Sequence, residues 1–156
     1  MAALLLATGC TAGPPAPAPT ATGPVPAPTA SVPIAGPALA ACQALLQALP
    51  AAIDPGVERR PVEGDPAGFA AWGDPPVLLQ CGVAVPDRQE QPATVNGVAW
   101  SVRDIGAGFR WTTTELGVNI SVDIPDGYAN GAELINPLAA PILATLPQAS
   151  STAPSG

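Results

Sequence analysis

Apolar and polar residues alternate along several segments in the second half of the chain, the pattern of β-strands that bury one face. The clearest segment is 118–124, with valine and isoleucine at even positions and Asn, Ser and Asp at odd ones. Similar alternation covers 98–103, directly after the turn-forming pair Asn96-Gly97, and 109–113. The apolar run 77–81 indicates a buried strand. We predict an antiparallel sheet of about four strands with one face in contact with solvent.

Residues 37–49 have helical spacing instead. Their larger apolar side chains recur every three or four positions, so that they share one side of a helix. Pro37 suits the first helical turn, where its missing backbone donor costs nothing, and Pro50 ends the pattern. The first element of the folded part is therefore predicted to be a helix.

A second helical region is predicted at the other end of the chain, over 131–146. Asn130 or Asn136 is its expected N-cap. Pro137 and Pro141 are expected to break or kink it into two pieces. With helices at both ends and strands between, the predicted fold class is α+β: a two-layer sandwich whose N- and C-terminal helices cover one face of the sheet.

The first ten residues resemble the end of a bacterial lipoprotein signal, because the apolar run Leu4–Leu6 leads through small residues to Cys10. Cys10 is the predicted lipidation site, and its lipid would hold the protein to a membrane. Such signals open with positive charge, which is missing here, so translation is expected to start upstream of Met1. The alternative is that Cys10 is an ordinary thiol in a ragged N-terminus.

Composition divides the chain into four parts. Residues 1–10 are the lipoprotein signal remnant and lipobox. Residues 11–36 are almost wholly Pro, Ala, Thr, Gly and Ser, with too few large apolar side chains to offset the entropy of ordering, so we predict a disordered stalk. The globular α+β domain is predicted over 37–147, and residues 148–156 form a polar, disordered tail.

The charged residues are strongly biased towards acids. The chain has twelve Asp and Glu residues, five arginines and no lysine, which gives a net charge of −7. A surface of this kind repels nucleic acid phosphates and anionic lipid headgroups, so no nucleic acid partner is predicted and membrane contact is expected only through the lipid at Cys10. The alternative role of the acids is to keep the domain soluble.

Once Cys10 is assigned to a lipid, the other two cysteines form an even pair. In an exported chain Cys42 and Cys81 are predicted to form a disulfide. Closing a loop of this length stabilises a fold by about 4 kcal/mol in the chain-entropy model. The alternative is a pair of free, buried thiols.

Catalytic chemistry is poorly supported. The chain contains no histidine and no lysine, which removes the usual general base, the Ser-His and Cys-His nucleophile pairs and most zinc sites. Oxygen-bearing residues in 123–133 resemble a calcium loop only loosely, since turn formation and capping explain them. We therefore predict no enzyme activity, no cofactor and no metal. A hydrolase using two carboxylates is the remaining possibility, with candidates Asp54, Glu58, Asp74, Asp104, Glu115 and Asp123.

The segment from Trp72 to Pro76 is the candidate binding patch. It places a large aromatic side chain, Trp72, beside the carboxylate of Asp74 on a turn stiffened by Pro75 and Pro76. Rigid patches of this composition bind partners. The structural alternative is that Trp72 covers the core beside the disulfide while the following residues turn into the strand.

Four segments of the chain form a distinctive combination: Ala41-Cys42, 71–82 (AWGDPPVLLQCG), the turn 95–100 (VNGVAW) and the loop at Tyr128. Together they resemble those of a family of actinobacterial exported proteins known as domain of unknown function 3515. The resemblance implies a membrane-associated or secreted protein without an established activity, and the paired cysteines of the family correspond to Cys42 and Cys81.

These observations lead to one functional prediction. The protein is expected to be a lipid-anchored domain on the extracytoplasmic face of a bacterial cell membrane, where it acts as a binding or accessory module for an envelope protein or a cell-wall ligand. Two alternatives stay open: a structural envelope lipoprotein without a specific ligand, and a carboxylate-dependent hydrolase acting on envelope glycans.

Overall fold

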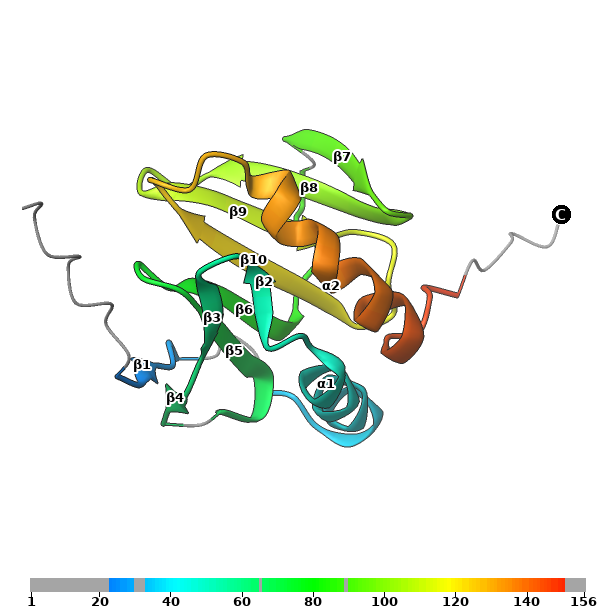
Figure 1. Cartoon of the computed structure of the whole chain (residues 1–156). Helices are drawn as coiled ribbons and strands as arrows, with labels where there is room; N and C mark the ends of the chain where they lie inside the picture. Colours follow the sequence, from blue (N-terminus) through cyan, green and yellow to red (C-terminus); the bar gives the residue numbers. More distant parts are fainter. Residues whose placement is uncertain (1–22, 30–32, 65, 89, 151–156) are drawn as a thin grey trace, which may run out of the picture.

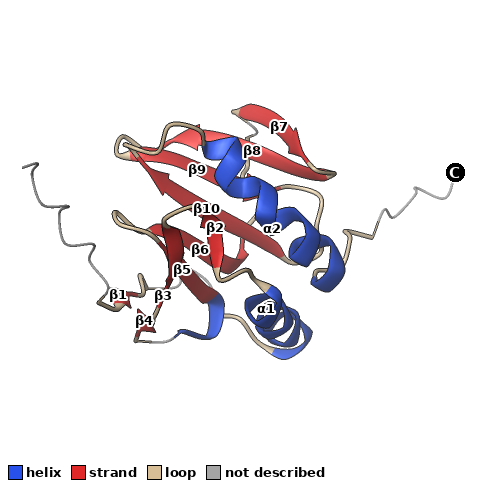
Figure 2. Ribbon diagram, in the orientation of Figure 1, coloured by secondary structure: helices blue, strands red, loops and turns tan. Residues whose placement is uncertain are grey.

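A computed structural model of the chain describes residues 23–29, 33–64, 66–88 and 90–150. Its elements are two α-helices, ten strands and one short 3-10 helix (Figures 1 and 2). None of the helices in the described residues is long and apolar enough to span a membrane. The strands are Val25–Pro26 (β1), Ala52–Asp54 (β2), Val57–Arg60 (β3), Val62–Glu63 (β4), Phe69–Trp72 (β5), Val77–Val83 (β6), Gln91–Val95 (β7), Val98–Asp104 (β8), Gly108–Thr113 (β9) and Asn119–Pro125 (β10); the helices are Gly36–Ala48 (α1), Pro66–Gly68 (η1) and Gly131–Thr145 (α2).

The main sheet is antiparallel throughout and has eight strands, in the order β2-β3-β5-β6-β10-β9-β8-β7. The predicted fold class, α+β with an antiparallel sheet, is confirmed, but the predicted number of about four strands is wrong. The missed strands carry no clear alternation: β5 is buried at all four positions, and β2 has only three residues. Burial on both faces hides the period that marks a strand in the sequence.

The predicted hairpin is present between β7 and β8. Val95 pairs with Val98, and the two turn residues have positive φ, 47° at Asn96 and 83° at Gly97. This backbone matches a type I′ turn, which suits the twist of the flanking strands. The Asn96 side-chain amide also donates to Asn136 Oδ1 at 3.2 Å, which links the hairpin to α2.

Both helices share one hydrophobic core with the same face of the sheet. The predicted disulfide is confirmed: Cys42 of α1 is bonded to Cys81 of β6, so the N-terminal helix is tied to a central strand. Trp72, Trp100 and the apolar positions of β6 and β10 fill the space beneath the helices. Asn130 is the N-cap of α2, although its side chain makes no capping hydrogen bond.

Helix α2 is continuous across both of its prolines, and Figure 2 shows one helix lying across the sheet. The predicted break into two pieces is wrong. Each proline removes one backbone donor, but the apolar face made of Leu134, Ile135, Leu138 and Ile142 is at most 3% exposed. Packing of that face on the sheet outweighs the lost hydrogen bonds, because tertiary contacts supply most of the stability of a helix in a protein.

The alternation predicted that the second face of the sheet is in contact with solvent, but part of this face is buried. Ser101, Thr112 and Ser121 are only 3%, 6% and 5% exposed. The connection from β6 to β7 covers this face. At the end of β6, Ile34 packs against the core and lies so close to Gly82 that an added Cβ would meet it at 3.0 Å. Gly82 also has φ +79°, so a side chain there would be both strained and crowded.

The folded domain extends further at both ends than predicted. Strand β1 pairs in parallel with β4, Val25 is buried, and Arg60 donates to the Gly23 carbonyl. Residues 23–29, predicted as stalk, therefore pack on the domain because main-chain pairing and one buried valine hold them. At the other end the Ala149 amide donates to the Glu115 carbonyl, so the domain boundary passes 147. Residues 11–22 and 30–32 of the predicted stalk, residues 151–156 of the predicted tail and the lipidation site Cys10 lie outside the described residues.

Candidate functional site

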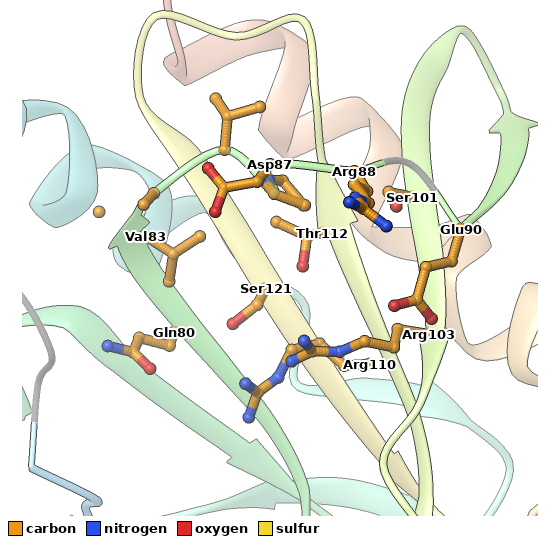
Figure 3. Close-up of a pocket in the computed structure, with 14 residues that line it drawn as sticks. Gln80, Val83, Asp87, Arg88, Glu90, Ser101, Arg103, Arg110, Thr112 and Ser121 are labelled. Atoms are coloured by element: carbon orange, nitrogen blue, oxygen red, sulfur yellow. The ribbon is translucent and has the colours of Figure 1, made fainter.

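A cavity lies on the face of the sheet opposite the two helices, and the topology explains why it forms. Strand β6 lies next to β10, whereas β7, the next strand along the chain, is the edge strand beyond β8. The connection from Val83 to Gln91 therefore has to pass β10, β9 and β8. Four strand spacings amount to roughly 19 Å, and eight extended residue steps reach roughly 26 Å. The connection is therefore long enough to cross the sheet with little slack, and its residues 83–88 and 90 line the cavity on this face (Figure 3).

The cavity beneath this connection has a volume of about 530 Å³. That is within the range of roughly 300–1,000 Å³ typical of small-molecule sites. Four central strands supply its floor, and the connection supplies one wall (Figure 3). The lining residues on strands include Gln80, Ser101, Arg103, Arg110, Thr112 and Ser121, and those on the connection include Asp87, Arg88 and Glu90.

The floor contains a straight row of hydroxyl and amide groups, which is set by strand register. Ser101 pairs with Thr112, Thr112 with Ser121, and Ser121 with Gln80, so four adjacent strands contribute one polar residue each. Within the described part of the chain, none of the three hydroxyl groups has a hydrogen-bond partner. Among the described residues, Trp100 Nε1 is the side-chain polar atom that is both shielded from solvent and without a hydrogen-bond partner. The three hydroxyls also lack partners but are not shielded, so they are reachable from the cavity.

A second row, two residues further along the same strands, is charged. Arg103 pairs directly with Arg110, and Arg110 with Asp123. Arg110 donates to Asp123 through Nε and Nη2, both at 2.6 Å. This hydrogen bonding is the main reason why the pKa of Arg110 is raised, so the guanidinium remains charged. Arg103 has no hydrogen bond or ion pair to the described residues.

The candidate binding patch of the sequence analysis does not hold together as a surface. Trp72 is 0% exposed, and its Nε1 donates to the Pro50 carbonyl at 3.1 Å. Arg59 covers the ring, with its Cζ 5.6 Å from the ring centroid. The structural alternative is therefore the correct one for Trp72, since its apolar area is large enough to be drawn into the core while its one polar atom finds a partner.

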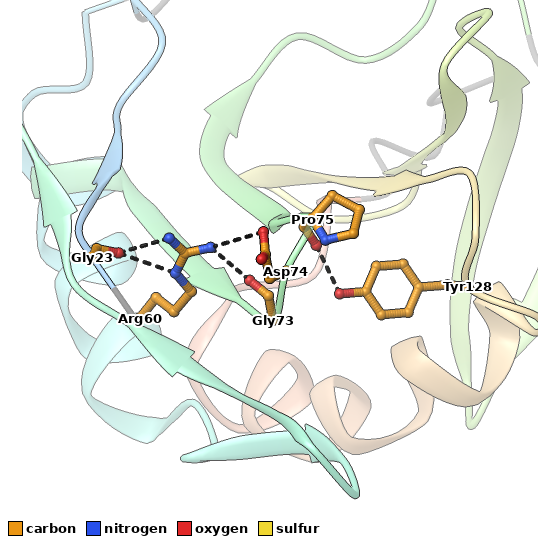
Figure 4. Close-up of polar contacts among 6 residues, drawn as sticks. All are labelled: Gly23, Arg60, Gly73, Asp74, Pro75 and Tyr128. Carbon is orange, nitrogen blue, oxygen red and sulfur yellow. Dashed lines mark hydrogen bonds and ion pairs between the residues drawn. The ribbon is translucent and has the colours of Figure 1, made fainter. Parts of the chain in front are cut away.

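Asp74 and Pro75 do lie at the surface, in a turn that other parts of the chain hold in place (Figure 4). The Asp74–Pro75 peptide bond is cis. Arg60 donates to the Gly73 carbonyl at 2.8 Å and lies 3.7 Å from the Asp74 carboxylate. Tyr128 Oη donates to the Pro75 carbonyl at 2.7 Å. Burial, and then the charge of Asp74, raise the pKa of Tyr128, so the phenol keeps the proton that it donates.

A family model described as "Protein of unknown function (DUF3515)" matches residues 1–151. The chain belongs to this family. The resemblance noted in the sequence is thereby confirmed, and the match spans the described domain and the segment before it. Neither a curated protein nor a solved structure matches the chain.

In this DUF3515 protein the six carboxylates considered for hydrolysis have separate structural surroundings. Asp74 is held by Arg60 and Asp123 by Arg110, while Asp104 accepts a hydrogen bond from the Gly106 amide at 2.7 Å. Asp54 lies in β2, Glu58 in β3, and Glu115 in the connection before β10. The carboxylates of the cavity, Asp87 and Glu90, were not among these candidates.

The cavity of this DUF3515 protein was not predicted from the sequence, although the residues of its floor follow a visible pattern. Ser101, Thr112 and Ser121 occupy the polar positions of three alternating strands. Solvent exposure is the usual reason for such positions, so nothing local marked them as covered. The register between the strands, which aligns them in one row, depends on long-range pairing.

Proposed function

We propose that this protein is a ligand-binding module of the bacterial cell envelope, held at the extracytoplasmic membrane face by a lipid on Cys10. The Leu4–Cys10 pattern supports the anchor. The Cys42–Cys81 disulfide supports an oxidising compartment, since such bonds form and persist outside the cytosol. The module uses the cavity under the β6–β7 connection to bind a polar molecule that is smaller than a protein.

The observation that carries this proposal is the row of unpartnered hydroxyls. Ser101, Thr112 and Ser121 make no hydrogen bond within the described residues, and their hydroxyls are reachable from one cavity. Hydroxyl groups in protein interiors are usually paired with protein or water, so these three are available to a ligand. A bound molecule with several hydrogen-bond donors or acceptors pairs with all three hydroxyls at once. Water takes its place when the molecule is absent.

Membrane attachment is tested with the full chain expressed from an upstream start in an actinobacterial host. The wild type is expected to partition with membranes and to carry the mass of a lipid. Cys10→Ala is expected to move to the soluble fraction because the anchor is lost. Equal membrane partitioning of the two proteins would contradict the anchor and leave the cavity proposal untouched.

Ligand binding is tested by titrating the isotope-labelled full chain with envelope building blocks and following amide shifts by NMR. The panel contains N-acetylglucosamine, N-acetylmuramic acid, D-alanyl-D-alanine and glycerol 3-phosphate. At least one is expected to cause saturable shifts around Ser101, Thr112 and Ser121. Thr112→Val keeps the shape but removes one hydroxyl, so it is expected to weaken binding about fivefold.

Thr94→Val is the matched control, since Thr94 is exposed on β7 and is not among the residues that line the cavity. It is expected to bind as the wild type does. The binding function is contradicted if no probe shifts the cavity amides, or if the two valine variants are weakened equally.

A further inference from the structure

We propose that the ligand of this cavity carries a phosphate-class oxyanion, bound by Arg103 together with the hydroxyl row. This inference rests on the function proposed above and specifies the chemical class of its ligand.

The chain has five cationic side chains, all arginine, against twelve acids. Two of the arginines are engaged in structure: Arg59 donates to the Leu46 carbonyl and covers Trp72, and Arg60 holds the Asp74 turn. The other three, Arg88, Arg103 and Arg110, line this cavity, where Arg110 is paired with Asp123. Three of the five positive charges are therefore gathered at this place, together with the carboxylates of Asp87 and Glu90.

Arg103 and Arg110 are directly opposite each other on β8 and β9. Like charges in this position repel and destabilise a strand pair. Asp123 neutralises Arg110 from the other side, but no carboxylate of the described residues lies within ion-pair distance of Arg103. An anion beside Arg103 would pair with the one guanidinium of this row that has no carboxylate partner.

The hydroxyl row supplies further donors to the same anion. Ser101 and Arg103 lie on the same face of β8, as Thr112 and Arg110 do on β9. Two residues along a strand are about 6.8 Å apart, a separation that a flexed arginine side chain covers. A guanidinium fork matches the oxygens of a phosphate, and hydroxyls donate to the oxygens that remain.

The composition of the lining favours an anion over an uncharged sugar. None of the lining residues is aromatic, so the cavity offers no flat apolar surface for a neutral ring. Asp87 and Glu90 on the connection are exposed, as Arg103 is, and their negative charges oppose an anion. Removing the charge of Glu90 is therefore expected to strengthen binding of the oxyanion at low ionic strength.

The experiment measures binding of inorganic phosphate and glycerol 3-phosphate to the full chain at low ionic strength, with glycerol as the uncharged comparison. Both phosphates are expected to shift the amides around Arg103 and Thr112, and glycerol is not. Arg103→Gln is expected to weaken phosphate binding about tenfold or more, because a charge-assisted pair is lost. Glu90→Gln is expected to strengthen it, and added salt to weaken it.

Ala140→Glu is the control for net charge. Like Arg103→Gln, it makes the net charge of the protein more negative by one. The substituted residue is exposed on α2, across the sheet from the cavity. Phosphate binding by this variant is expected to stay within a factor of two of the wild type. Vesicles containing phosphatidylglycerol, compared with vesicles of neutral lipid, show whether the oxyanion is taken from a lipid headgroup or from a soluble molecule.

The oxyanion inference is overturned if the cavity binds an uncharged probe that Thr112→Val weakens and Arg103→Gln does not. The binding function would survive that result. If neither phosphate nor any uncharged probe shifts the cavity residues, both the inference and the proposed function fail.

Discussion

Replacing Cys42 and Cys81 together by alanine is expected to lower the free energy of unfolding by about 4 kcal/mol. The cysteines are 39 residues apart in sequence, so the bond removes much of the conformational freedom of the unfolded chain. It also ties α1 to a central strand, and both residues are at most 1% exposed. Urea denaturation of the full chain, followed by tryptophan fluorescence, measures the change.

The matched comparison is the wild type with and without a reductant, which breaks the same bond without changing the sequence. Cys10→Ala is the control for the loss of a cysteine outside the pair. A double variant within 1 kcal/mol of the wild type would show that the remaining contacts of α1 hold it in place unaided.

Trp72→Ala is expected to cost about 3–5 kcal/mol of stability, the range for truncating a buried aromatic side chain. The ring is fully buried in the core, and its removal leaves the Pro50 carbonyl without its donor and takes away the ring that Arg59 covers. The melting temperature should fall by well over ten degrees for a domain of this size. Scanning calorimetry of the full chain measures it.

Phe109→Ala is the control, because Phe109 is an aromatic residue on the neighbouring part of the sheet that is 44% exposed. Phe109→Ala is expected to lower the free energy of unfolding by only about 0.5 kcal/mol. Trp72→Phe should recover part of the loss, since it restores most of the volume but not the hydrogen bond to Pro50. An unchanged melting point for Trp72→Ala would contradict the core assignment and return Trp72 to the list of binding residues.

Helix α1 and the β7–β8 hairpin were predictable because their signals are local. The spacing of apolar residues over 37–49, a proline at each end and the pair Asn96-Gly97 each act within a few neighbouring residues. The disulfide was predictable for a different reason, since assigning Cys10 to a lipid leaves one pair of cysteines. None of these features needs a distant part of the chain to be specified.

The strands β2, β3 and β5 and the continuity of α2 were not predictable in this way. Strand β5 is buried on both faces, so its residues show no period. Helix α2 contains two prolines that local preference would exclude, and it persists because one of its faces is packed against the sheet. In both cases contacts with distant residues outweigh the local preference.

The cavity illustrates the same division. The alternation in β8, β9 and β10 already placed Ser101, Thr112 and Ser121 on the polar side of their strands. Register then aligns them. Because β10, β9 and β8 lie between β6 and β7, the next connection has to pass three strands, and it does so on that side. Period-two patterns specify which side chains share a face, but pairing and strand order are long-range properties, and those alone turn a polar face into a covered site.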